Sequence, residues 1–311
     1  MDKVSWPAQA AQAAFPKPPH IRFFDREAPL GFLLLAPTLF MLLAFLAYPF
    51  IVGLWLSVTD SEVGVIGRFV GLANYRFEFL NDPVFLTSVS NTFVYTAVTT
   101  VFKLVLGLVM ALVLNQAFSL QRFVRAALLL PWIIPTVLST LAWRWMFDPT
   151  FSVVNWVLTH SGLAARGVDW LGTPQTAMAS LIIVNVWRGA PFYGISFLAG
   201  LQIIPVELYE AAKMDGATRW HQLLNITLPM LRPVLLVVLL LSTILTFADF
   251  QLPFVLTNGA PYSSSHVLAT WAYAQAIQGG AIGIGAAVSL VLFPVLSIVT
   301  AAVLIALRKQ D

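Results

Sequence analysis

The chain has 311 residues, of which 59% are hydrophobic and only 10% are charged, and its formal net charge is +3. An ordinary soluble domain carries about 25% charged residues, so this much apolar surface calls for lipid as its solvent. The small net charge argues against a nucleic-acid-binding protein. The absence of cysteine excludes disulfides, thiol catalysis and cysteine metal sites.

The chain begins with a polar to mixed segment, residues 1–30. Ala, Gln and Pro dominate positions 7–19, a composition typical of a loose tail. The first apolar run begins near residue 31 and is far longer than the roughly 7–15 residues of a signal-peptide core. We therefore expect a tail over 1–30 and a membrane domain over 31–311.

Six apolar segments follow in the chain. A helix needs about 20 apolar residues to cross a bilayer. The candidate spans are 31–57, 91–115, 125–147, 175–201, 232–256 and 281–307. Several contain proline or glycine, which membrane helices tolerate where neighbours satisfy the freed backbone groups. The sequence thus predicts an all-α membrane protein with six transmembrane helices.

Lysine and arginine predict the orientation, because they gather on the cytoplasmic side of membrane proteins. With the N-terminus inside, the inner segments are 1–30, 116–125, 202–232 and 308–311. Most of the 17 basic residues then lie inside, namely Lys3, Lys17, Arg22, Arg26, Arg122, Arg125, Lys213, Arg219, Arg232, Arg308 and Lys309. We expect both termini, and the loop 202–232 between the fourth and fifth spans, to be cytoplasmic.

The loop 202–232 is a polar segment in an otherwise apolar chain. Pro205 and the acids behind it, including Glu210, are typical of a helix start. Ala211 and Ala212 are small enough for a partner's backbone to approach, and Gly216 permits a bend. A second short amphipathic segment follows. Spacing alone leaves two interpretations: a docking knob for a soluble partner, or amphipathic helices on the membrane surface.

The residue order of this loop resembles the signature loop of permeases in binding-protein-dependent ABC importers. The matching residues are Glu210, Ala211, Ala212, Gly216, Ile226, Leu228 and Pro229. Further motifs resemble the carbohydrate-type subfamily, which includes the first permease of the maltose and glycerol-3-phosphate uptake systems. These motifs are 71–75, 91–92, 130–132, 143–145, 185–187 and 257–259. The resemblance covers nearly the whole chain after the tail.

In that family the loop inserts into a cleft on a cytoplasmic ATPase. The resemblance implies that Glu210, Ala211, Ala212, Asp215 and Gly216 couple this chain to ATPase subunits. It also implies a second permease, two ATPase subunits, an extracytoplasmic solute-binding protein and a prokaryotic cytoplasmic membrane. The implied solute is a sugar, a polyol or a glycerol-phosphate-like molecule.

The chain itself is expected to be a transport subunit and not an enzyme. It has no G-x-x-x-x-G-K-[ST] phosphate loop, so ATP and Mg are expected on the ATPase subunits. Its spans contain no paired carboxylates, histidine cluster or nucleophile–base arrangement. We expect no catalytic residue, cofactor or metal in this chain.

Three ionisable residues stand out in the middle part of the spans: Lys103, Arg188 and Asp249. Such residues cost about 2.5–3.5 kcal/mol on insertion scales, so they are functional candidates by default. Ser242, Thr246 and Asp249 fall at i, i+4 and i+7 on one helical face, which should meet a cavity or another helix. Lys103 is expected to be structural, either snorkelling or facing a neighbouring subunit.

The fourth span carries Asn185, Trp187, Arg188 and Gly189. The resemblance implies sugar contacts for Asn185, Trp187 and Gly189, although Asn185 and Trp187 point to different faces. Arg188 departs from the apolar residue of the maltose-type permease. It either recognises an anionic solute or pairs with Asp249, and pairing is the simpler interpretation.

Trp132 and Thr136, four residues apart on the third span, also match sugar-contact positions of the maltose-type permease. The other interpretation of Trp132 is an aromatic belt residue at the membrane interface. The main hypothesis is thus a permease subunit of an ATP-driven importer for a sugar or related polar solute. The alternative is a stand-alone secondary carrier or channel that uses Arg188 and Asp249 as an ion relay.

Overall fold

The computed structural model describes residues 27–116 and 118–308, which form α-helices joined by loops and short π-helical turns. The chain divides into two units, residues 1–52 and 53–311. The first contains α1 (Glu27–Leu42), the π-helical turn η2 (Leu43–Ala47) and the start of α2 (Tyr48–Ser57). Most of the predicted tail, 1–30, lies outside the described residues, and α1 begins within its last four positions.

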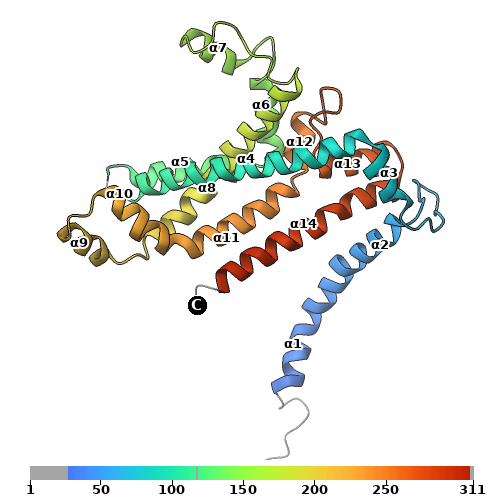
Figure 1. Ribbon diagram of the computed structural model, residues 1–311, viewed down its shortest axis with the longest axis horizontal. Helices are drawn as coiled ribbons and strands as arrows, with labels where there is room; N and C mark the ends of the chain where they lie inside the picture. Colours follow the sequence, from blue (N-terminus) through green and yellow to red (C-terminus); the bar gives the residue numbers. More distant parts are fainter. Residues whose placement is uncertain (1–26, 117, 309–311) are drawn as a thin grey trace, which may run out of the picture. The chain divides into compact units, whose positions relative to one another are not determined.

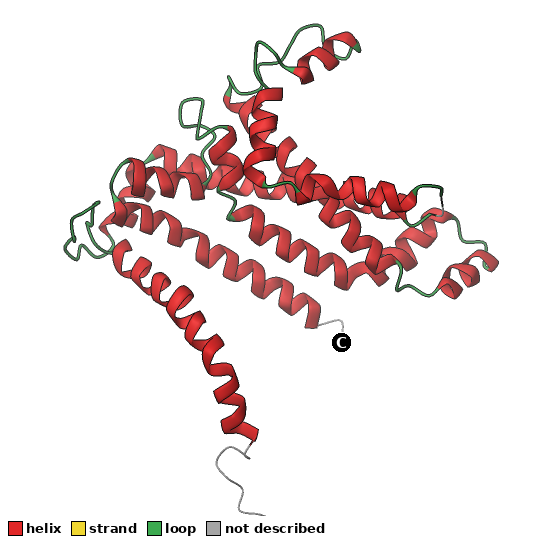
Figure 2. Ribbon diagram, turned by 180° about the vertical axis from the view of Figure 1, so that it is seen from behind, coloured by secondary structure: helices red, strands yellow, loops and turns green. Residues whose placement is uncertain are grey.

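The second unit holds the remaining elements. In chain order they are α3 (Ala73–Asn81), α4 (Pro83–Leu114), α5 (Gln121–Ile133), α6 (Thr136–Met146), α7 (Val153–His160), α8 (Pro174–Leu201), α9 (Val206–Met214), α10 (Arg219–Gln222), η3 (Leu223–Thr227), α11 (Leu228–Phe247), α12 (Gln251–Leu256), α13 (Leu268–Tyr273), η4 (Ala274–Gln278) and α14 (Ile282–Arg308). Figure 1 labels most of them, and Figure 2 shows the same arrangement from behind.

The membrane-spanning segments agree with the predicted all-α membrane fold. Five helical segments of the described chain are long and apolar enough to cross a bilayer: Gly31–Ser57, Pro83–Leu114, Pro174–Leu201, Arg219–Phe247 and Ile282–Arg308. The helices α5 and α6 add a sixth span if the bent pair counts as one. The predicted location of the termini remains a prediction.

Two spans differ from their predicted form, because each is broken. The predicted span 125–147 is two helices, α5 and α6, which meet at an angle of 91°. Pro135 lies at the corner in an extended conformation (φ −53°, ψ 134°) and has no N–H to continue the helix. The predicted span 232–256 ends early: α11 stops at Phe247, and α12 starts only at Gln251.

The helix α4 begins earlier than the predicted span 91–115, because Asp82 caps it. The Asp82 carboxylate accepts hydrogen bonds from the backbone N–H groups of Val84 (2.8 Å) and Phe85 (3.2 Å). Proline at the first helical position is also compatible with a helix start. The added turns carry α4 beyond its most apolar stretch.

The core of the second unit lies between α4, α8 and α11, which pack side by side (Figures 1 and 2). Ala111 of α4, Tyr193 and Phe197 of α8, and Leu231 and Val238 of α11 are buried together. This packing fixes the directions in which the polar residues of the three helices point.

Polar side chains fasten the loop that precedes α13. The Asn91 amide nitrogen donates to the carbonyls of Ser264 (2.7 Å) and His266 (2.9 Å). The Thr92 hydroxyl accepts from the backbone N–H of Leu268 at 2.8 Å. The motif Asn91-Thr92 therefore has a structural role, because it hydrogen-bonds backbone groups that have no partner within a helix.

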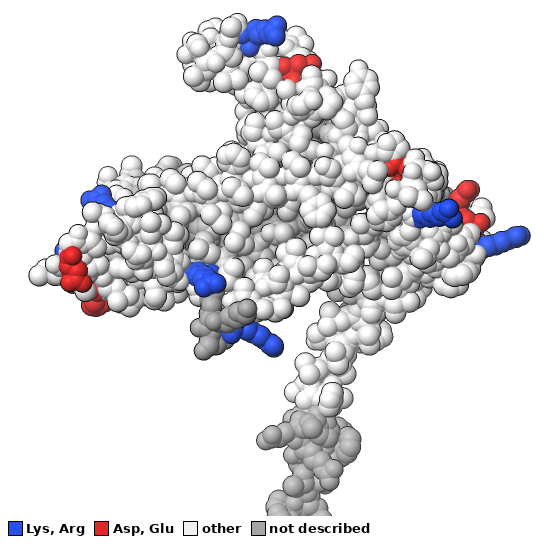
Figure 3. All heavy atoms as spheres, viewed as in Figure 1, with Lys and Arg blue, Asp and Glu red and all other residues white. Residues whose placement is uncertain are grey.

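Charged side chains lie mainly outside the apolar helices. On the face shown in Figure 3, they gather near α7, near α9, near the C-terminal end of α14 and near the loop before α3. The flank of α4 between these regions is uncharged on this face, as expected for a surface in contact with lipid.

Candidate functional site

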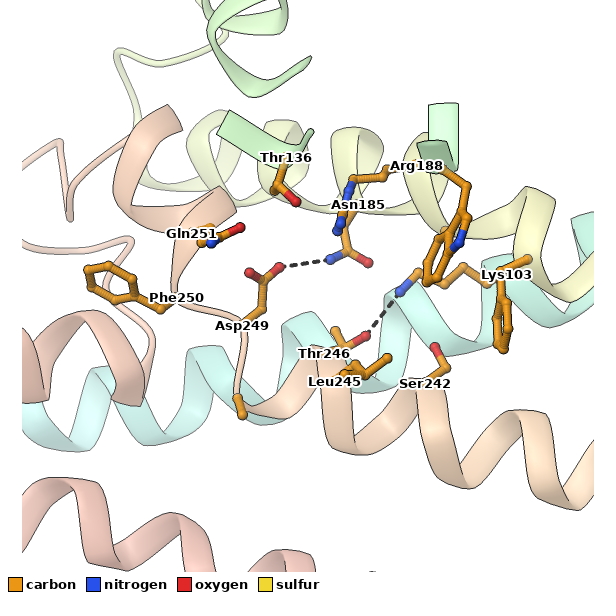
Figure 4. A pocket seen from close by; sticks show the side chains of 14 residues that line it. Lys103, Thr136, Asn185, Arg188, Ser242, Leu245, Thr246, Asp249, Phe250 and Gln251 are labelled. Atoms are coloured by element: carbon orange, nitrogen blue, oxygen red, sulfur yellow. Dashed lines mark hydrogen bonds between the residues drawn. The ribbon is translucent and has the colours of Figure 1, made fainter. Parts of the chain in front are cut away.

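A cavity of about 420 Å³ lies between α4, α8, α11 and the two helix breaks (Figure 4). Its volume falls within the range of about 300–1,000 Å³ that is usual for small-molecule sites. Eight of the predicted solute-site residues line it: Trp132, Thr136, Asn185, Arg188, Gly189, Ser242, Thr246 and Asp249. The structure therefore brings together residues that are more than a hundred positions apart in the sequence.

The two helix breaks form part of the cavity wall. Trp132 lies in the last turn of α5 and Thr136 starts α6, on either side of the Pro135 corner. Ala248, Asp249 and Phe250 form the break between α11 and α12. Irregular backbone at membrane depth is tolerated where it lines a cavity, and transporters bind solutes at such discontinuous helices.

Asp249 is held by a network of hydrogen bonds. One carboxylate oxygen accepts from the Tyr95 hydroxyl (2.9 Å) and the Asn185 amide (3.1 Å). The other accepts from the backbone N–H of Leu252 at 3.3 Å, in the first turn of α12. The Asn185 amide also donates to the Tyr95 hydroxyl. Asp249 thus follows the end of α11, instead of continuing a helical stripe with Ser242 and Thr246.

Arg188 lies against an aromatic ring. Its guanidinium carbon is 5.7 Å from the ring centre of Trp132, within the range of a cation–π contact. Phe192 stacks on the same indole, with ring centres 4.9 Å apart. The buried Nε of Arg188 has no hydrogen-bond partner among the described residues. Arg188 therefore contacts Trp132, whereas other groups hydrogen-bond the carboxylate of Asp249.

Lys103 lines the cavity, although it was expected to be a structural residue outside the solute site. Its side chain is only 3% exposed, and its ammonium group donates to the Thr246 hydroxyl at 3.0 Å (Figure 4). Of the two arrangements expected for Lys103, snorkelling is therefore wrong, because the side chain is buried. The side chain passes over Gly189, where an added Cβ would lie 2.6 Å from the Lys103 Cε. Gly189 makes room for this lysine, a pairing between two helices that no local pattern reveals.

Trp187 is the predicted solute-site residue that does not line the cavity. Its side chain is 37% exposed and packs edge to face against Trp143, with ring centres 5.4 Å apart. The expectation that Asn185 and Trp187 point to different faces is confirmed, because Asn185 is buried at the cavity.

The predicted coupling residues lie in an exposed segment formed by α9 and the turn after it, residues 206–217, which we call the knob. Glu210, Ala211, Asp215 and Gly216 are exposed, and Ala212 is half-buried. After α9, the backbone N–H of Ala217 donates to the carbonyl of Ala212 at 2.9 Å. Gly216 has φ = 79°, a left-handed conformation that side chains resist.

The knob is tied to the membrane helices at its base. The Tyr209 hydroxyl of α9 lies 3.0 Å from the Thr227 hydroxyl of η3, directly before α11. Ile203 and Met214 expose apolar surface beside the charged residues of the knob. An exposed mixture of this kind is typical of a protein–protein contact surface.

Broken membrane helices around a polar cavity, with an exposed helical knob between two spans, define a multi-pass membrane transport protein. Residues 103–307 match the family "Binding-protein-dependent transport system inner membrane component", to which this chain belongs. It is therefore an inner-membrane permease subunit of an ABC importer, a transport subunit whose family leaves ATP hydrolysis to separate subunits.

Several curated relatives span nearly the whole chain. The trehalose/maltose transport system permease protein MalF of Thermococcus litoralis is 37% identical, over 86% of this chain and 90% of the relative. The sulfoquinovosyl glycerol transport system permease protein SmoG of Agrobacterium fabrum is 34% identical, over 91% of each. The trehalose transport system permease protein SugA of Mycobacterium tuberculosis is 32% identical, over 88% of this chain and 87% of the relative.

Solved structures show the same fold. A chain of a bacterial ABC transporter that imports the acidic polysaccharide alginate superimposes with a TM-score of 0.78. It is 25% identical, and the match covers 90% of this chain and 95% of that one. A structure of a bacterial alginate transporter with an alginate pentasaccharide-bound periplasmic protein gives a TM-score of 0.76 at 26% identity, over 88% of this chain and 92% of that one.

Proposed function

We propose that this chain forms half of the translocation pathway for a sugar or related polar solute. The observation that carries the proposal is the cavity at the two helix breaks, lined by hydroxyl, amide and charged side chains. Groups of this kind exchange hydrogen bonds with sugar hydroxyls. The names of the relatives support a sugar, since they refer to maltose, trehalose and sulfoquinovosyl glycerol.

In this proposal Thr136, Asn185, Arg188, Ser242 and Thr246 contact the solute. Trp132 acts mainly by holding Arg188, and Asp249 by holding Asn185 and the start of α12. Gly189 acts by admitting Lys103. Trp187 has no place in the contact set, because it does not line the cavity.

The knob around α9 docks on a cytoplasmic ATPase subunit in the proposed complex. Glu210, Ala211, Ala212, Asp215 and Gly216 form the contact, with ATP and Mg bound by the two ATPase subunits. A second permease completes the pathway, and an extracytoplasmic binding protein delivers the solute. The exposed apolar and charged groups of the knob support this assignment.

The proposal is tested by a pair of matched glycine substitutions. Gly216 in the knob and Gly64 in the loop after α2 both have φ = 79° and open space around the Cβ position. Alanine in this conformation costs about 1–2 kcal/mol. Gly216→Ala should lower ATP-driven uptake about fivefold or more in proteoliposomes that hold all subunits, whereas Gly64→Ala should leave it within twofold.

A second measurement separates this proposal from a stand-alone carrier. The unmodified chain should co-purify with ATPase subunits, and uptake should require ATP. Uptake by this chain alone, driven by an ion gradient and unaffected by Gly216→Ala, would instead establish a stand-alone carrier.

A further inference from the structure

The cavity holds more positive than negative charge. Among the described residues that line it, Lys103 and Arg188 are cationic and Asp249 is the one carboxylate. One carboxylate can offset only one of the two cations. Lys103 is buried and Arg188 is partly exposed, and a net positive charge in a partly buried cavity favours an anionic occupant.

The carboxylate of Asp249 is already used within the protein. Its two oxygens accept hydrogen bonds from Tyr95, Asn185 and the backbone of Leu252. These hydrogen bonds come from the start of α12 and from two neighbouring helices, and among the described residues none joins Asp249 to Arg188. The guanidinium of Arg188 lies over Trp132 instead.

The free hydrogen-bonding capacity at Arg188 suits an anion. A guanidinium that lies over an aromatic ring keeps its N–H donors at its edge, in its own plane. The Nε of Arg188 is such a donor, and it is buried without a partner among the described residues. A carboxylate, phosphate or sulfonate can accept from two N–H groups of this edge at once.

The side-chain oxygen of Asn185 is a second buried atom without a partner in the part of the chain that the structure describes, and it requires a hydrogen-bond donor. The Asn185 side-chain oxygen has no hydrogen-bond donor among the described residues, although its amide nitrogen is fully engaged. An oxygen of this type accepts from a hydroxyl group. Asn185 and Arg188 lie three positions apart on α8, and both line the same cavity (Figure 4).

The start of α6 adds to the positive character of the cavity. Thr136, its first residue, lies on the cavity wall, and no side chain caps this end of the helix. The first backbone N–H groups of a helix carry partial positive charge and favour an anion nearby.

We infer that the solute is an acidic sugar, with its anionic group held by Arg188 and a hydroxyl group held by the Asn185 oxygen. This inference rests on the proposed transport function and names the charge of the solute. The chemistry at Arg188 is shared by sugar acids and by lipid headgroups with a net negative charge, so the test includes both.

The test measures binding by calorimetry to the complete transporter, without the solute-binding protein, in phosphatidylcholine nanodiscs. The probes are galacturonate and galactose and the corresponding disaccharides, which differ by one carboxylate per ring. A charge-assisted hydrogen bond accounts for about a tenfold change in affinity or more. The acid of at least one pair should bind about tenfold more tightly than its neutral partner.

Substitutions of Arg188 test whether this side chain causes the preference for the acidic sugar. Arg188→Gln should remove the preference for the acid, so that the acid and the neutral sugar of a pair bind with similar affinity. Arg188→Lys should retain part of it, because the charge remains. Arg144→Gln is the matched control, since Arg144 is exposed and lies outside the cavity lining.

Four results would overturn the inference. The first is neutral sugars binding as tightly as their acids, or no probe binding at all. The second is Arg188→Gln weakening both classes equally, which would make Arg188 a structural residue or one neutralised by the partner permease. The third is galacturonate binding lost in phosphatidylglycerol nanodiscs, which would identify a lipid headgroup as the resident anion. ATP-driven uptake of a neutral sugar would sink this inference and leave the proposed function standing.

Discussion

Glu78 shows how burial alters a single side chain outside the membrane-spanning segments. It is 1% exposed and lies near Asp82 beneath α13. The indole N–H of Trp271 donates to both carboxylates, at 3.3 Å and 3.1 Å. Burial, and secondarily the charge of Asp82, raises the pKa of Glu78 from 4.5 to about 7.

This raised pKa predicts a pH-dependent stability. Between about pH 4.5 and 7 the folded protein keeps a proton on Glu78 that the unfolded chain releases, so stability falls as pH rises through this window. Above the window both states are ionised, and the contribution no longer changes. Glu78→Gln should flatten the slope of the unfolding temperature between pH 5 and 7.

The control for this prediction is Glu62→Gln, which changes an exposed glutamate in the loop after α2. It should leave the slope of the unmodified protein in place. An unchanged slope in Glu78→Gln would show that another group causes the pH dependence.

At the scale of elements, the break between α11 and α12 depends on contacts from other helices. Asp249 joins the break to Tyr95 of α4 and Asn185 of α8. A hydrogen bond to a charged group contributes about 1.5–3 kcal/mol. The irregular backbone at the break is stable because these helices hold it.

Removing one of these contacts gives a measurable prediction. Tyr95→Phe deletes the hydroxyl that donates to Asp249 and accepts from Asn185. The purified transporter should lose about 1–3 kcal/mol of stability in thermal unfolding. Tyr262→Phe is the control, because the Tyr262 side chain is 94% exposed and should tolerate the change. Equal unfolding temperatures for both variants would argue against a stabilising role of this network.

The sequence correctly predicted that the spans are helices. It did not predict that two of these helices are broken. Long apolar runs identify membrane helices, because hydropathy depends on composition alone. Breaks do not follow from composition: Pro191 lies inside the continuous helix α8, whereas Pro135 stands at a 91° corner. The break at 248–250 contains neither proline nor glycine. Tertiary hydrogen bonds to Asp249 accompany it, and no local pattern records them.

The sequence also predicted most residues of the candidate site but not all of them. The resemblance selected Asn185 and Thr136, and the spacing of Ser242 and Thr246 selected one face of α11; all four line the cavity. Lys103 was missed, because the direction of a lone lysine on an apolar helix depends on which neighbouring helix leaves space for it.

For the whole molecule, the orientation in the membrane is the main remaining prediction. The cytoplasmic location of the knob and termini follows from the distribution of lysine and arginine. The chain has no cysteine, so single cysteines can be introduced without background labelling. Asp215→Cys in the knob should react with a membrane-impermeant maleimide only after cell lysis. Glu62→Cys should react in intact cells, and the reverse pattern would contradict the predicted orientation.

The knob lies at the turn of a helical hairpin whose two arms both reach the cavity. From the knob, α8 runs back from Leu201 to Asn185, and α11 runs forward from Leu228 to Thr246 without a break. At about 1.5 Å per residue each arm is roughly 25 Å long. A tilt of about 10° over such an arm displaces its far end by about 4 Å. A movement of the knob therefore tilts α8 and α11 together. Such a tilt changes the positions of Asn185 and Thr246 at the cavity, which lies at the far ends of the two arms.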